Sequence, residues 1–147
     1  MPKKKPQKLI VNYTIPYFVF GIVSGEKGFV ISNELNNLLH LKLRLFNQIE
    51  LLISGNVKFF ETFSFKPEDT SLTYSLISTS SKTGPLIELY RNIDYFLIIS
   101  GTESATIHKK EIIGKIKSPL ILAVSELEIK GKKEKEILQE ILQQIWI

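Results

Sequence analysis

Few side chains in this chain are suited to catalysis or to metal binding. Cysteine is absent, which excludes disulfides, thiolate nucleophiles and cysteine-based metal centres. The two histidines, His40 and His108, are far apart in the sequence, and neither has acidic residues at the short spacings of a metal site. Such a site needs three or four converging ligands. We therefore expect no metal, and we expect both histidines at the surface or at helix ends.

Glu88 and Asp94 are the best candidate pair of carboxylates, and Tyr95 follows directly. Two acids on either side of a cleft could support hydrolysis, so an enzyme that uses these three residues is one hypothesis. It would require their side chains to converge in a cavity. The alternative is that Asp94 caps a turn or binds backbone amides before a strand, which is a common role of aspartate in loops. We favour this second interpretation of the candidate motif loop.

Glycines and serines do not complete a catalytic or phosphate-binding motif. Gly21, Gly25 and Gly28 are spaced four and three residues apart, which matches neither the dinucleotide fingerprint nor the P-loop. Ser24 and Ser54 lack the glycine pattern of a nucleophile elbow. We therefore predict no cofactor and no catalytic residue, and a protein that is not an enzyme.

The positive charge of the chain is concentrated at its N-terminus. The net charge is +4, and the lysines that precede the first acidic residue, Glu26, are Lys3, Lys4, Lys5 and Lys8. These four belong to a total of 19 basic residues, so 15 remain after residue 8 to balance 15 acidic residues. We predict a flexible basic tail over residues 1–8 on a neutral body. The tail either keeps the chain soluble or makes weak contact with RNA or with anionic lipid.

The N-terminal region resembles a secretory signal only in outline. An apolar stretch over residues 9–23 follows the lysines, but Asn12, Thr14 and Pro16 interrupt it, and no Ala-x-Ala cleavage site follows. The uninterrupted runs are far shorter than the ~20 residues that a membrane-spanning helix requires. We expect a cytoplasmic protein without membrane contact.

Runs of β-branched and aromatic residues predict a sheet. The predicted strands cover residues 48–54, 57–65, 72–79, 93–100 and 120–127. The run 17–23 is apolar without alternation, so it is either a buried strand or a buried helical turn. The run 93–100 is nearly continuous in apolar residues and is expected to be central. Residues 54–56, Ser-Gly-Asn, suit a tight hairpin turn.

Alternation along residues 57–65 indicates which side chains of that strand face the core. Phe59, Glu61, Phe63 and Phe65 share one parity, and successive side chains of a strand point to opposite faces. We expect this set to face the core and the opposite set to face water.

Three helices are predicted from apolar residues at helical spacing. The first covers about residues 29–40, the second about 104–117 and the last about 133–146. We predict one α+β domain over residues 9–147, with a mostly antiparallel sheet, helices on one face and an amphipathic C-terminal helix.

The C-terminal helix carries a continuous apolar stripe that must be covered. Its candidate interface residues are Ile137, Leu138, Ile141, Leu142, Ile145 and Trp146. The stripe either docks on the chain's own sheet or binds a second copy or another protein. The pattern alone is compatible with both.

Two segments of the chain are similar to a known family. The first is Leu35-Asn36 with Leu39, Leu41 and Leu43, preceded by residues 21–24, Gly-Ile-Val-Ser. The second covers residues 87–95 and includes Ile87, Asp94 and Tyr95. They resemble the helix-one region and the naming motif of the IPExxxVDY family, small bacterial proteins typical of the Bacteroidetes without an assigned function.

The resemblance covers about residues 8–128 and departs from the family at two positions. Glu88 stands where the family has proline, and Leu89 stands where it has glutamate, whereas Ile93 replaces valine conservatively. The final helix is also longer than expected of the family. The resemblance implies a shared fold and a cytoplasmic bacterial setting, and it implies no reaction.

Two functional hypotheses follow. The leading one is a non-enzymatic cytoplasmic module for protein–protein interaction, with a protein partner or a second copy of the chain, because catalytic groups are few and the C-terminal helix is apolar. The alternative is an RNA- or ribosome-associated accessory protein that contacts phosphates through its N-terminal lysines.

Overall fold

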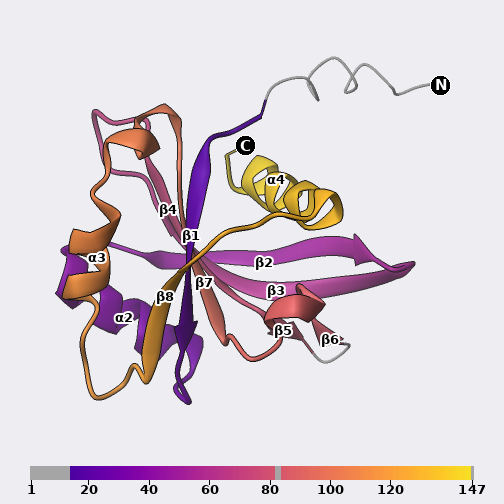
Figure 1. The fold of residues 1–147 in the computed structure, drawn as a ribbon, viewed down its shortest axis with the longest axis horizontal. Helices are drawn as coiled ribbons and strands as arrows, with labels where there is room; N and C mark the ends of the chain where they lie inside the picture. The colour runs from indigo at the N-terminus through magenta and orange to yellow at the C-terminus, as the bar shows by residue number, and fades with distance from the viewer. Residues whose placement is uncertain (1–13, 82–83, 147) are drawn as a thin grey trace.

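A six-stranded antiparallel sheet organises the chain, with the strand order β2-β3-β4-β7-β1-β8 (Figure 1). The structure is a computed structural model and describes residues 14–81 and 84–146. The strands of the sheet are β1 (Tyr17–Val23), β2 (Arg44–Ile53), β3 (Asn56–Phe65), β4 (Thr73–Ser78), β7 (Tyr95–Ser100) and β8 (Ala123–Leu127). A small ribbon of β5 (Ser80–Ser81) and β6 (Gly84–Pro85) forms a separate sheet. The predicted single-domain α+β fold is confirmed.

Strands β1 and β7 lie side by side inside the sheet. All six residues of β7 are buried, as expected for a central strand covered on both faces. β1 pairs with β7 on one side and with β8 on the other. The apolar run 17–23 is therefore a strand and not a helical turn, because it pairs with β7 along its length and with β8 from Val19 onwards.

The hairpin of β2 and β3 turns at Ser54 and Gly55, as the sequence predicts. Both residues have positive φ angles, 53° and 81°, and Ile53 pairs directly with Asn56. Two residues with positive φ form the turn whose twist matches that of the flanking strands. The hairpin extends well beyond β4, since β3 pairs with β4 only from Thr62 onwards (Figure 1).

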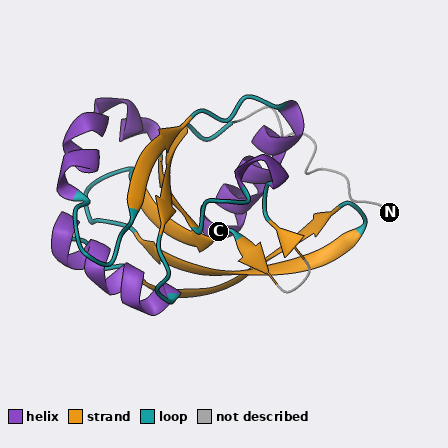
Figure 2. Cartoon of the chain, turned by 60° about the horizontal axis from the view of Figure 1, so that its bottom comes forward, coloured by secondary structure: helices purple, strands orange, loops and turns teal. Residues whose placement is uncertain are grey.

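Helices cover both faces of the sheet (Figure 2). α2 (Gly28–Leu39) and α3 (Lys109–Lys115) lie on one face, where Ile31 and Leu35 of α2 pack with Leu97 of β7. α4 (Lys132–Trp146) lies on the other face. Two of the helices thus share a face as predicted. The C-terminal helix takes the opposite face, since a sheet with apolar side chains on both sides needs a cover on each.

The predicted second helix is divided in the structure. A 3-10 turn, η2 (Thr102–Thr106), precedes α3, and Ile107 and His108 separate the two elements. The prediction of one helix over 104–117 was therefore wrong in its first part. His108 is the N-cap residue of α3 and has an extended backbone.

The expected face assignment of β3 was partly wrong. Phe63 is buried as predicted, but Phe59 is half exposed, whereas Phe60 and Thr62 of the opposite parity are completely buried. Phe60 belongs to the core under α4, and Phe63 belongs to the core under α2. Because each face has its own helix, both parities of the strand contribute to a core.

Candidate functional site

Asp94 and Tyr95 fasten the start of β7 to the loop between β1 and α2. The Asp94 carboxylate accepts a hydrogen bond from the Ser24 backbone N–H at 2.9 Å. The Tyr95 hydroxyl donates to the backbone carbonyl of Glu26 at 2.6 Å. Both side chains are thus hydrogen-bonded to backbone groups. This agrees with the interpretation in which Asp94 binds backbone amides before a strand.

Glu88 does not join these two side chains. It lies in the 3-10 turn η1 (Glu88–Tyr90) and forms an exposed ion pair with Arg91 at 2.7 Å. Asp94 and Tyr95 instead point into the loop at residues 24–26. The three candidate residues are therefore not brought together as an enzyme that used them would require.

The apolar stripe of α4 docks on the chain's own sheet. Leu138, Ile141, Leu142 and Ile145 are at most 3% exposed, and they pack with Ile49 and Phe60 of the hairpin. Ile137 is partly buried at the margin of the same cluster, and Trp146 is the last residue of the helix. The sequence was compatible with docking on the chain's own sheet and with binding to another chain. The four central residues of the stripe dock on the chain's own sheet.

The two histidines lie at helix ends, as expected. His40 follows α2 in a left-handed conformation with φ of 57°, and His108 precedes α3. Both side chains are exposed. Among the described residues, no group of three or more His, Cys, Asp or Glu side chains could hold a metal ion.

The basic tail of residues 1–8, with Lys3, Lys4, Lys5 and Lys8, lies outside the described residues. Contact with RNA through these lysines therefore stays a prediction. In the part of the chain that the structure describes, no helix combines the length and the apolar character needed to cross a membrane.

Exposed apolar side chains gather on the hairpin, on the face opposite α4. Leu52 is 68% exposed, and Val57 and Phe59 are each 49% exposed. Leu52 pairs directly with Val57, and Phe59 pairs with Glu50 two residue pairs further from the turn. We call Leu52, Val57 and Phe59 the hairpin patch. This patch was not predicted from the sequence, although the run Leu51-Leu52-Ile53, which is apolar on both faces of the strand, was a signal for it.

A second unusual feature is an open position on the edge of β1 at Tyr17. The Gly101 N–H donates a backbone hydrogen bond to the Pro16 carbonyl, so the carbonyl of Pro16 points towards the β7 side of β1. Backbone groups alternate in direction along an antiparallel strand, which directs the N–H and C=O of Tyr17 away from β7. β8 would lie there, but its pairing with β1 ends at Val19 and Leu127. Neither backbone group of Tyr17 has a strand partner among the described residues.

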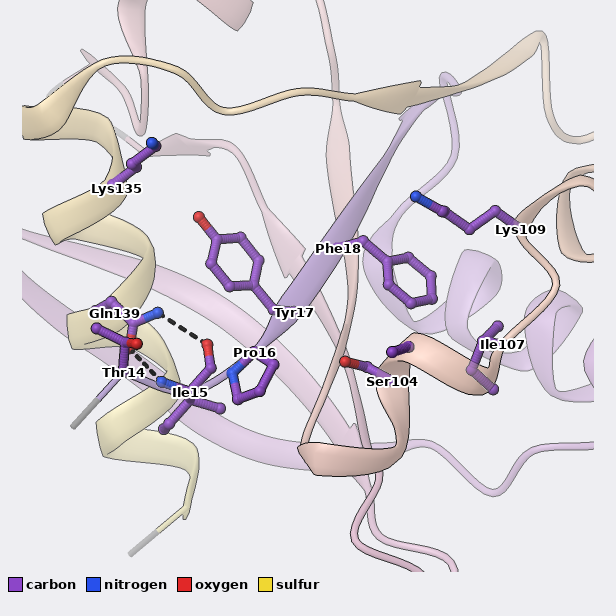
Figure 3. A pocket seen from close by; sticks show the side chains of 11 residues that line it. Thr14, Ile15, Pro16, Tyr17, Phe18, Ser104, Ile107, Lys109, Lys135 and Gln139 are labelled. Carbon is purple, nitrogen blue, oxygen red and sulfur yellow. Dashed lines mark hydrogen bonds between the residues drawn. The ribbon is translucent and has the colours of Figure 1, made fainter.

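The neighbouring position on this edge is occupied by a side chain of α4. Gln139 accepts a hydrogen bond from the Ile15 N–H and donates one to the Ile15 carbonyl, each at 3.0 Å (Figure 3). The edge of β1 is therefore bound at Ile15, open at Tyr17 and bound again from Val19 onwards.

A cavity of about 670 Å³ surrounds the open position. Figure 3 shows Tyr17 and Phe18 on opposite sides of β1, with Lys135 on the side of Tyr17 and Lys109 on the side of Phe18. Burial raises the pKa of the Tyr17 phenol above its ordinary value, so its hydroxyl keeps its proton and can donate. The volume lies within the usual range of ligand sites.

The two lysines of the cavity differ in their electrostatic surroundings. Lys109 forms an ion pair with Glu126 at 2.8 Å and lies over the Phe18 ring. Lys135 has no ion pair within the described residues. The uncompensated positive charge of the cavity is therefore on the Tyr17 side.

Comparison with known proteins adds no family to these observations. No protein-family model matches the sequence, and no curated protein is significantly similar to it.

Proposed function

We propose that this protein is a non-enzymatic, cytoplasmic module for protein–protein interaction, and that the hairpin patch is its contact surface. The observation that carries the proposal is the exposure of Leu52, Val57 and Phe59 side by side on a hairpin that extends beyond its neighbour β4. Contiguous exposed apolar side chains with a polar rim are typical of interaction sites. The α4 stripe is buried and does not serve this purpose.

The charges beside the hairpin patch favour a partner with basic residues. Glu50 lies directly opposite Phe59, and Glu61 follows on the same face of β3. Both are exposed. Two copies of this chain that met through the patch would bring these carboxylates together, and like charges at an interface are unfavourable. We therefore favour an apolar partner surface rimmed by lysine or arginine over a second copy.

Site-specific photo-crosslinking tests this proposal in the full chain. A photoreactive phenylalanine analogue replaces Phe59, and the control carries it at Leu89, which is also exposed but lies on η1. Both proteins are produced in the native cells and irradiated. We expect one discrete heteromeric product from position 59 and none from position 89.

The charge of the rim provides the second arm of this experiment. Combining the analogue at position 59 with Glu50→Lys and Glu61→Lys should reduce the product at least about fivefold, because rim charges steer association. The proposal is wrong if both positions give the same products, if position 59 gives none, if the charge reversal leaves the yield unchanged, or if the product is a dimer of the chain.

We also propose kinship with the IPExxxVDY family. In its support, two of the matching residues, Asp94 and Tyr95, act together on one loop, and that loop follows the matching segment 21–24. Two residues that hold a loop in place give a sequence motif a structural role, even when the motif takes part in no reaction.

A further inference from the structure

We propose that the open position of β1 at Tyr17 binds an extended acidic peptide segment of a partner protein, which adds to the sheet as a short strand. The proposal goes beyond the hairpin patch, because β1 and the β2–β3 hairpin lie in different parts of the sheet, separated by β4 and β7. The two sites can be tested independently.

The backbone geometry selects a peptide as the ligand. Tyr17 directs one donor and one acceptor outward from the same residue, and an extended peptide offers the complementary acceptor and donor at matching spacing. β8 pairs in this way with β1 from Val19 onwards, and the Gln139 amide forms the same two kinds of hydrogen bond with the backbone of Ile15. Addition of a strand to an open edge is a recurrent mode of peptide recognition.

The side chains around the site select an acidic residue. Directly opposite residues of two paired strands carry their side chains on the same face of the sheet. A peptide residue opposite Tyr17 therefore extends towards Lys135, whose charge is unpaired within the described residues. A glutamate or aspartate at this position could form an ion pair with Lys135 and accept a hydrogen bond from the Tyr17 hydroxyl.

The charge of the site also disfavours the chain's own N-terminus as its occupant. Thr14, which lines the cavity, is the first described residue and is covalently joined to residues 1–13. That segment contains four lysines and no acidic residue. Lysines brought next to Lys135 and Lys109 would repel them. An acidic segment of another protein is complementary.

The test uses a three-residue probe peptide, acetyl-Thr-Glu-Thr-amide, and the ¹⁵N-labelled full chain, because Ile15 and Val19 on either side of Tyr17 already have partners. One matched peptide has lysine at the centre, and a second has an N-methyl group on the central glutamate. Amide chemical shifts report the site, and hydrogen exchange reports protection of the Tyr17 N–H. We expect the probe to shift the amides of Tyr17 and Phe18 and to slow exchange at Tyr17, and we expect both matched peptides to lose binding.

A charge reversal on α4 provides the protein side of the test. Lys135→Glu should weaken the probe about fivefold or more, because an exposed attraction becomes a repulsion. Lys133→Glu changes the net charge equally on the same helix, at an exposed residue that does not line the cavity, and should change affinity less than twofold.

Several results would overturn the proposal. They are shifts that map away from Tyr17, equal binding of the N-methylated or lysine peptide, equal effects of the two charge reversals, or no binding at all. Protection of the Tyr17 N–H in the free protein would also overturn it, because the position would then be filled by the chain itself.

Discussion

The side-chain amide of Gln139 pairs with the backbone of Ile15 as a strand residue would, through one donated and one accepted hydrogen bond of 3.0 Å. Gln144, five residues further along α4, repeats the arrangement at Glu50 on the edge strand β2, with distances of 2.8 and 3.4 Å. α4 is therefore held by apolar packing and by two amide pairs, one at Ile15 before β1 and one at Glu50 on the edge strand β2.

The Gln139 pair is expected to stabilise the fold measurably. Gln139→Leu removes both bonds and leaves two partly buried backbone groups without their partner, which should lower the free energy of unfolding by about 1–3 kcal/mol. Gln143→Leu, at an exposed position of the same helix, should change it by less than about 0.5 kcal/mol. Urea unfolding measures both, and equal effects would contradict the role of the amide pair.

Tyr95 should make the protein less stable in alkaline solution. Burial raises the pKa of its phenol above the ordinary 10.0, and the carboxylates of Glu61, Asp94 and Glu26 raise it further. The unfolded chain therefore loses this proton at lower pH than the folded chain, so the stabilisation is complete below about pH 10 and is lost as the pH rises further.

Tyr95→Phe provides the control for this pH dependence. It should cost about 1 kcal/mol at pH 8, because the hydrogen bond to the Glu26 carbonyl is lost, and it should flatten the decline above pH 10. Part of the decline remains, because two other half-buried tyrosines have raised pKa values. Urea unfolding between pH 8 and 11 measures both effects, and a decline as steep as that of the unmodified protein would refute the assignment to Tyr95.

Two buried serines should respond oppositely to replacement by alanine. The Ser24 hydroxyl donates to the Leu120 carbonyl at 2.7 Å and accepts from the Glu26 N–H at 3.1 Å, so Ser24→Ala should cost about 1–2 kcal/mol. The Ser75 hydroxyl is buried without a partner among the described residues. Ser75→Ala should be neutral or stabilising by up to about 1 kcal/mol, because a buried hydroxyl without a hydrogen bond is unfavourable. Thermal unfolding of both variants checks the difference, and a larger loss at Ser75 would contradict it.

Truncation of Leu142 tests the docking of α4. The side chain is completely buried against the sheet, so Leu142→Ala should destabilise the protein by about 2–5 kcal/mol. Glu140→Ala, at an exposed position of the helix, should have little effect. If Leu142→Ala left the unfolding midpoint unchanged, the apolar stripe would not be docked in solution.

Gly101 is expected to tolerate no side chain. Its φ is 119°, and a Cβ atom there would lie 1.8 Å from the Ser71 carbonyl oxygen. Gly101→Ala should therefore destabilise the protein by more than about 2 kcal/mol. Gly114→Ala adds a methyl group to α3 where no atom other than the local helix backbone lies within 4 Å, and it should stabilise the protein by about 0.5–1 kcal/mol. Chemical unfolding of the two variants compares them, and a harmless Gly101→Ala would contradict the close approach.

The existence of most elements followed from local patterns. The run that became β7 contains apolar residues at nearly every position, which is typical of a strand buried on both faces. The Ser54-Gly55 turn could also be predicted from the sequence, because few residue types readily adopt the positive φ angles that this turn requires. The apolar stripe of α4 follows in the same way from the helical period.

The sequence by itself thus determined the α+β class, the central strand, the tight hairpin and the need to cover the C-terminal helix. The tertiary structure decided what covers that helix, where apolar side chains stay exposed and which backbone groups stay open. Asp94 meets Ser24 across 70 positions of sequence, and Tyr17 is open because β8 leaves the sheet after Leu127. Such relationships depend on contacts between distant segments, and residue spacing along one chain carries no information about the distance between two of its folded parts.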